Sequence, residues 1–182
     1  MNKIKTNSRI LTILLMIFGA AFMRIMPHYP NFTPIAGMAL FGGAYFPNKK
    51  TAFIIPVTAM FLSDLILGFH STMWAVYLSF ILIAAIGLSL RKGKKISNII
   101  LASTASSVLF FVITNFAVWL AWGIYPMSYT GLIECYIAAI PFFHYTMLGD
   151  LFYAGVLFGV FELIQAKFPV IAEAKLSHEE TI

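Results

Sequence analysis

Residues 73–122 decide the fold: MWAVYLSFILIAAIGLSL (73–90) is followed by RKGKK (91–95) and then by ISNIILASTASSVLFFVITNFAVWLAW (96–122). The two long runs contain no charged residue, and each has the length that crosses the hydrocarbon core of a bilayer, about 20 apolar residues. The short stretch between them is almost entirely Lys and Arg, a composition typical of cytoplasmic loops. The stretch therefore predicts two membrane-spanning helices joined in the cytoplasm.

The composition of the whole chain has the same character. Its 182 residues are 60% hydrophobic and 10% charged, against roughly 45–50% and about 25% in ordinary globular domains. A net charge of +5 would suit nucleic-acid binding, but the basic residues lie in short clusters between apolar runs. This placement favours a polytopic membrane protein and excludes nucleic acid as a partner, along with a disordered chain, a disulfide-rich domain and a cytosolic enzyme. The single Cys135 belongs to no metal motif.

Apolar runs predict six helices in an all-α fold, with no β-sheet and no soluble domain. We expect them at Ile10–Met26, Pro34–Phe46, Ala52–Leu67, Met73–Leu90, Ile96–Trp122 and from Ala138 or Pro141 to Phe168. The second and third are short for a complete crossing, so they should tilt little or line a cavity. The chain is thus divided into a basic cytoplasmic N-terminus (1–9), a six-helix transmembrane domain (10–168) and a cytoplasmic polar tail (169–182).

The distribution of basic residues predicts the orientation. Lys and Arg cluster before the first helix, between the second and third, between the fourth and fifth, and after the sixth, whereas the connections 27–33, 68–72 and 123–137 contain none. The positive-inside rule therefore predicts that both termini lie on the cytoplasmic side of the membrane. A cleaved signal peptide is the competing interpretation of the N-terminus. Its removal would leave five spans and break the charge pattern.

Ionisable residues within membrane spans are costly and are therefore candidates for function. Arg24, Asp64 and Asp150 all fall in the outer half of the predicted membrane domain. Polar and aromatic residues also recur at helical spacing on the fifth and sixth helices. These stripes are Thr104, Ser107, Phe111, Asn115, Trp119 and Trp122, and Phe142, Thr146, Gly149, Asp150 and Tyr153. Aromatic surface with a few hydrogen-bonding groups is the usual lining of a small-molecule pocket.

We therefore predict one outward-facing cavity closed by the first, third and fifth loops. The predicted substrate-binding residues are Arg24, His28, Asn31, Asp64, His70, Asn115, Trp119, Tyr145 and Asp150. Arg24 should neutralise one of the two aspartates and leave the other to meet a donor group of the ligand. The structural alternative is an Asp–Arg pair that only fixes helix packing, with the Trp and Tyr residues forming an ordinary aromatic belt.

Catalytic and metal sites find weaker support in the sequence. His28, His70 and His144 could ligate a transition metal, but no H-x-x-x-H or H-E-x-x-H spacing occurs. A hydrolase triad of Ser63, Asp64 and His70 has no supporting spacing, and there is no G-x-S-x-G motif. We therefore predict no catalytic residue, no metal and no cofactor.

Several motifs resemble an uncharacterised bacterial family of putative transport proteins. The most specific is R-x-x-P-H-x-P-N-F-T-P at residues 24–34, and the others are the Gly-rich 37–43, Ser63-Asp64-Leu65 with Gly68-Phe69-His70, Pro141-Phe142-Phe143 and Gly149-Asp150-Leu151. The layout is more distantly similar to the S components of energy-coupling factor (ECF) transporters, which are six-helix membrane proteins with both termini inside. S components also dock on a coupling subunit through small residues of the first helix, typically A-x-x-x-A. Here Gly19-Ala20-Ala21 is small but lacks that spacing.

The resemblance implies a polytopic six-transmembrane-helix bundle that binds a small micronutrient such as a vitamin for uptake and has no catalysis of its own. The chain contains no P-loop, so energy would come from separate ATPases with an ECF-type coupling subunit, or from an ion gradient. The alternative is a small intramembrane enzyme acting on a lipid or isoprenoid, with Asp64, Asp150 and the histidines as acid–base groups. A structural or assembly factor is a third possibility. Two aspartates against one arginine favour a neutral or cationic substrate.

Overall fold

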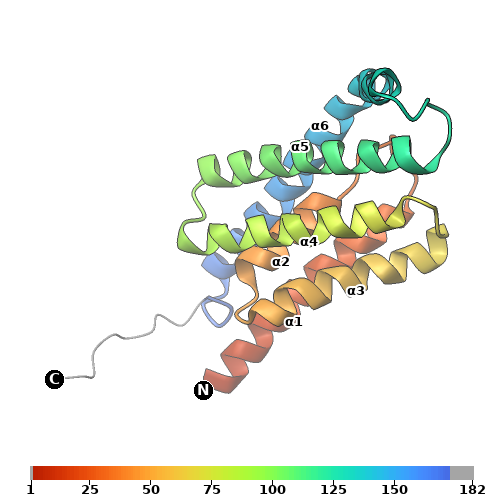
Figure 1. Ribbon diagram of the computed structural model, residues 1–182. Coiled ribbons are helices and arrows are strands. Elements are labelled where there is room, and N and C mark those ends of the chain that lie inside the picture. Colours follow the sequence, from red (N-terminus) through yellow and green to blue (C-terminus); the bar gives the residue numbers. More distant parts are fainter. Residues whose placement is uncertain (1, 173–182) are drawn as a thin grey trace.

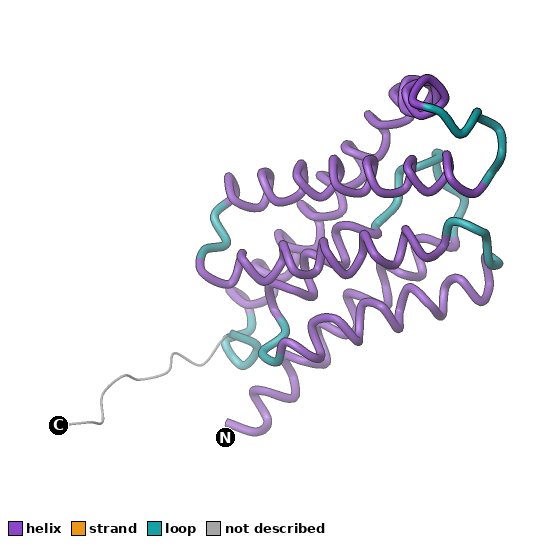
Figure 2. The backbone as a smooth tube through the Cα atoms, in the orientation of Figure 1, coloured by secondary structure: helices purple, strands orange, loops and turns teal. Residues whose placement is uncertain are grey.

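The computed structural model describes residues 2–172, with side chains from residue 7 onward. Its helices are α1 (Asn2–Ile25), α2 (Ile35–Tyr45), α3 (Lys49–Leu67), α4 (Met73–Ser89), the 3₁₀ turn η1 (Leu90–Lys92), α5 (Ile96–Ala121) and α6 (Tyr129–Lys167). No strand occurs within the described range (Figure 2), so the predicted all-α fold is confirmed. Two starts precede the predicted ones by more than three residues: α1 begins at Asn2, inside the predicted N-terminal segment 1–9, and α6 begins at Tyr129. Helix α3 begins at Lys49, three residues before the predicted Ala52. Most of the predicted tail, residues 173–182, lies outside the described residues.

Five of the helices are long and apolar enough to span a membrane. The spans are Asn7–Ile25, Lys49–Leu67, Met73–Lys92, Ile96–Ala121 and Tyr129–Lys167. The 11 residues of α2 extend about 16 Å, roughly half of the ~30 Å hydrocarbon core. The protein is therefore a multi-pass membrane protein. Of the two helices predicted to be short, α2 is short, whereas α3 is long enough to cross.

The short helix α2 lies at the centre of the bundle. In Figure 1, α3, α4 and α5 lie side by side in front, and α2 packs behind them against α3, α4 and α6. Every residue of α2 is buried. An all-round apolar surface suits a helix enclosed by others, and its glycines and alanines let those helices approach closely.

The contact between α2 and α4 provides a first prediction. A Cβ atom on Gly87 would lie 2.5 Å from the Leu40 carbonyl oxygen, and one on Gly43 would lie 2.3 Å from the Ala84 carbonyl oxygen. Gly87→Ala should therefore force α2 and α4 apart and lower the free energy of unfolding by about 1–3 kcal/mol. Thermal unfolding of the detergent-purified protein measures this. The control Gly159→Ala adds a Cβ that meets nothing within 4 Å, so a loss of equal size in both variants would contradict the packing argument.

The connection 26–34 joins α1 to the short helix α2. Asn31 has a φ of 63°, in the left-handed region that asparagine tolerates, and the Phe32 amide donates to the Tyr29 carbonyl oxygen at 3.0 Å. The backbone of this segment packs against α6 at Gly149, where an added Cβ would lie 3.0 Å from the Phe32 Cα. Irregular backbone inside a membrane protein is tolerated where it is buried in protein or lines a cavity. The irregular backbone of this segment therefore favours a cavity beside it.

The last helix is longer than one crossing requires. Its 39 residues would extend about 58 Å, well beyond the ~30 Å core. It contains Pro141, which removes a backbone hydrogen bond and allows a bend. Figure 1 shows the first turns of α6 end-on and its later turns running behind α5. The predicted start at Ala138 or Pro141 therefore coincides with the bend, and the helix itself begins at Tyr129.

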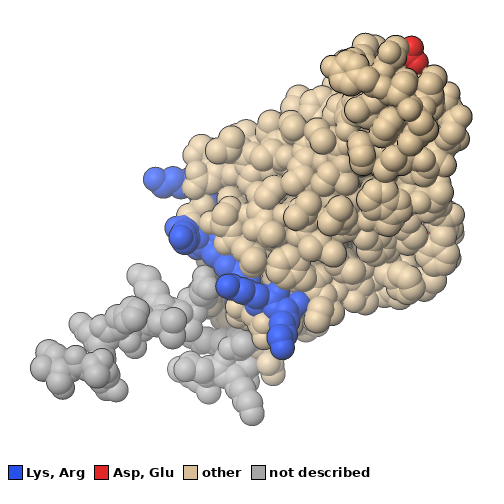
Figure 3. All heavy atoms as spheres, viewed as in Figure 1, with Lys and Arg blue, Asp and Glu red and all other residues tan. Residues whose placement is uncertain are grey.

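The two ends of the bundle differ in charge. Figure 3 shows Lys and Arg side chains gathered at one end of the visible face, near the N-terminus. We call this the basic end; it includes the connections 46–48 and 93–95. The opposite end, which we call the histidine end, consists of the connections 26–34, 68–72 and 122–128. The basic connections therefore lie together at one end of the bundle, and the side of the membrane that this end faces stays a prediction.

Candidate functional site

A cavity of about 480 Å³ lies at the histidine end, between α5, α6 and the connection 26–34. Its volume falls within the range of about 300–1,000 Å³ that is typical of small-molecule sites. Most of its wall is apolar, and six of its residues are aromatic: Phe110, Phe111, Trp122, Tyr125, Phe142 and Phe143. Such a wall can enclose a ring system through stacked or edge-to-face contacts.

A smaller recess of about 70 Å³ adjoins the cavity. Both are lined by Asn31, Phe110 and Thr146, and the recess also reaches Asp150. The remaining recess residues are Thr33, Ile35 and Ala36. Because a water molecule needs about 10–15 Å³ of such space, the recess has room for a small polar group.

Asp150 is the one acidic residue at this site. Only 3% of its surface is exposed, and one carboxylate oxygen accepts a hydrogen bond from the Ser107 hydroxyl at 2.7 Å. Within the described chain it has no ion pair and no second hydrogen bond. A buried carboxylate without a countercharge is costly, so this residue is the strongest candidate for contact with a ligand.

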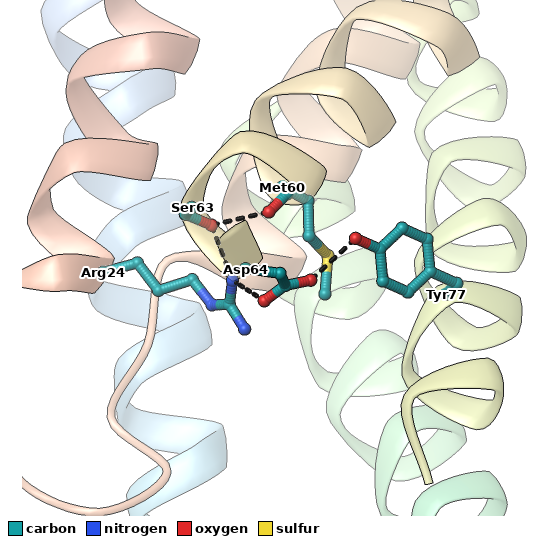
Figure 4. A network of polar contacts seen from close by, with 5 residues as sticks. All are labelled: Arg24, Met60, Ser63, Asp64 and Tyr77. Atoms are coloured by element: carbon teal, nitrogen blue, oxygen red, sulfur yellow. Dashed lines mark hydrogen bonds and ion pairs between the residues drawn. The ribbon is translucent and has the colours of Figure 1, made fainter. Parts of the chain in front are cut away.

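Arg24 and Asp64 form a separate polar cluster between α1, α3 and α4, shown in Figure 4. The Arg24 guanidinium forms an ion pair with the Asp64 carboxylate and donates to the Ser63 hydroxyl at 2.6 Å. The other carboxylate oxygen of Asp64 accepts from the Tyr77 hydroxyl at 2.7 Å, and the Ser63 hydroxyl donates to the Met60 carbonyl oxygen at 2.7 Å. None of these residues lines the cavity or the recess. The arrangement corresponds to the structural alternative for this pair.

The two predicted histidines lie on exposed connections, outside the cavity lining. His28 Nδ1 is 2.6 Å from the Met26 carbonyl oxygen, and His70 Nδ1 is 3.0 Å from the Thr72 hydroxyl oxygen. No group of three His, Cys, Asp or Glu residues that could hold a metal ion occurs within the described residues. These histidines make local loop contacts, and the structure does not bring them to Asp150.

Trp119 and Tyr145 also lie outside the lining, but they contact the connections beside it. The Trp119 indole donates to the Pro126 carbonyl oxygen at 2.9 Å. The Tyr145 ring is stacked on Tyr29, with ring centroids 6.0 Å apart. Each contact holds one connection of the histidine end against a helix. Of the nine predicted residues, the structure thus brings three to the cavity and its recess: Asn31, Asn115 and Asp150.

Several lining residues were missed by the sequence analysis. On α5, Phe110, Thr114 and Val118 form a row beside the predicted Phe111 and Asn115, because a cavity wall takes more of a helix face than one stripe at i, i+4 spacing. The missed residues of α6 are Cys135, Ala138, Ala139 and Phe143. Cys135 precedes even the earliest start predicted for this helix, so no helical stripe was extended that far. The signal for this residue would have been a predicted helix start before Cys135.

Comparison with known proteins identifies a family but no function. A family described as a family of unknown function (DUF6580) matches residues 4–171. No curated protein and no solved structure matches the chain.

Proposed function

The chain belongs to the DUF6580 family of unknown function, and we propose that it is the substrate-binding membrane subunit of an uptake system for a small micronutrient such as a vitamin. In this proposal the histidine end faces outward in the bacterial cytoplasmic membrane and receives the solute. The layout, which is distantly similar to that of ECF S components, supports it. Two motifs that resemble the uncharacterised family of putative transport proteins, residues 24–34 and Gly68-Phe69-His70, lie at the histidine end.

One observation carries the proposal: an aromatic cavity of about 480 Å³ adjoins a small recess that contains the unpaired carboxylate of Asp150. Apolar walls with few convergent polar groups are the usual features of a site that binds a small molecule. Helix packing alone gives no reason for a buried carboxylate without a cation. A ligand that meets this carboxylate would supply the reason.

The uptake role requires an energy source outside this sequence, because it contains no P-loop. We propose an ECF-type coupling subunit with separate ATPases as partners, or an ion gradient in their place. The coupling subunit would have to contact a lipid-facing surface of the bundle.

The enzyme alternative has less support from the geometry. Acid–base catalysis needs its groups within hydrogen-bond reach of one reacting atom. Asp64 is held by Arg24, Asp150 lies in the recess, and His28 and His70 make local contacts on separate connections. These groups do not surround one position.

Native mass spectrometry of the full chain, purified in mild detergent, tests the proposal. We expect a tightly bound, chemically unmodified small molecule. Ala139→Trp, which places a large ring in the cavity wall, should abolish its retention, whereas the control Leu163→Trp on the exposed surface of α6 should not. Retention by the Ala139→Trp variant, or an empty wild-type protein, would contradict the proposal, and turnover of the molecule without a partner would favour the enzyme.

A further inference from the structure

We propose that the ligand of this cavity is a ring-bearing organic cation whose protonated amine enters the recess and pairs with Asp150. This inference rests on the proposed function, because it takes the cavity as the binding site. It adds the chemical class of the substrate.

The charge of the site favours a cation. The sequence offers two aspartates and one arginine near the histidine end, and the structure assigns that arginine to Asp64. The residues that line the cavity and the recess include no Lys, Arg or His. In its ionised form, Asp150 is therefore the only charged residue among those that line the site. A cation offsets the cost of burying this carboxylate, whereas an anion would meet an uncompensated like charge.

The hydrogen-bond acceptors of the recess suit an ammonium group. An ammonium group has three donors and no acceptor. Besides Asp150, which has one carboxylate oxygen free of hydrogen bonds within the described chain, the recess is lined by Asn31, Thr33 and Thr146, each of which carries a side-chain oxygen. Its volume of about 70 Å³ suits a terminal amine. A ring attached to that amine would stay in the cavity.

The aromatic wall of the cavity lies beside the recess. Phe110 and Thr146 belong to both spaces, so a ligand in the cavity has the recess within reach. Aromatic faces attract cations and pack against ring systems. A bare inorganic cation such as Na⁺ would use the same oxygens but would leave the cavity of about 480 Å³ unoccupied. The combined shape therefore favours an amine with a ring over a metal ion.

Three probes that share one ring and differ in charge test this inference: tryptamine (cation), indole-3-ethanol (neutral) and indole-3-acetate (anion). Their affinities for the full chain in nanodiscs are measured by isothermal titration calorimetry. We expect tryptamine to bind at least about 10-fold tighter than indole-3-ethanol, a difference of about 1.4 kcal/mol. In Asp150→Asn the two affinities should become equal. Unchanged binding of indole-3-ethanol then shows that the variant is folded.

Glu134→Gln is the matched control, because it makes the same chemical change at an exposed position near the start of α6. It should keep the preference for tryptamine. The inference is overturned if the alcohol or the acid binds as tightly as the amine, if no amine binding occurs up to millimolar concentration, or if Asp150→Asn keeps the preference. It is also overturned if Na⁺ alone stabilises the wild type and tryptamine does not compete. In each of these cases, loss of the co-purified molecule in Ala139→Trp would still uphold the proposed function.

Discussion

Arg24→Met is expected to destabilise the protein by about 3–5 kcal/mol, the usual cost of removing one partner from a buried ion pair. The substitution leaves the Asp64 carboxylate, which is 2% exposed, with the Tyr77 hydroxyl as its remaining partner. It also removes the ion pair that joins α1 to α3. The change is measured as the loss of the cooperative thermal transition and of monodispersity in detergent.

A double-mutant cycle provides the control for this prediction. Asp64→Asn alone should also destabilise the protein, because it leaves the guanidinium of Arg24 buried without its carboxylate. Arg24→Met combined with Asp64→Asn removes both charges and should recover much of the lost stability. If the double variant is less stable by the sum of the two single effects, the pair does not hold the helices together. Asp150→Asn, by contrast, should remain folded, because an amide oxygen can still accept from Ser107.

Arg91→Ala is expected to lower the free energy of unfolding by about 2–4 kcal/mol, since hydrogen bonds to charged groups contribute about 1.5–3 kcal/mol each. The Arg91 guanidinium donates to the Gly43 carbonyl oxygen at 2.9 Å and to the Phe46 carbonyl oxygen at 2.6 Å. These carbonyls lie at the end of α2, where no further helical turn follows to satisfy them. A cation near the C-terminal end of α2 also interacts favourably with the helix dipole. Because α2 is buried on all sides, water does not replace these bonds easily.

Lys92→Ala is the matched control for Arg91→Ala, because it removes the same charge from the neighbouring exposed position. Its effect should stay within about 0.5 kcal/mol. Arg91→Lys should restore only part of the loss, since an ammonium group cannot reproduce the fork of guanidinium donors. Chemical unfolding of the purified protein measures all three variants. Equal stability of Arg91→Ala and Lys92→Ala would show that Arg91 acts only through its charge in the loop.

The all-α, multi-pass architecture followed from local sequence. A membrane-spanning helix satisfies its backbone hydrogen bonds within its own segment, so hydropathy along the chain is enough to find it. This is why the apolar runs at 73–90 and 96–122 predicted α4 and α5 within a few residues. The predicted helix boundaries were wrong where local sequence signals conflict with tertiary packing. Pro141 resembled a helix start, yet α6 continues through it.

The same sequence signals also placed Arg24, Asp64 and Asp150 at one level and assigned Asn31, Asn115 and Asp150 to a cavity. What they could not decide was the partner of each charge. In the sequence alone Asp64 and Asp150 are equivalent, since both are acidic residues in the outer half of a predicted span. Only the packing of α1 against α3 brings Arg24 to Asp64, and only the entry of the connection 26–34 beside Gly149 forms the recess around Asp150. Ion pairing falls off with distance in space, and the distance between side chains on different helices is set by tertiary packing.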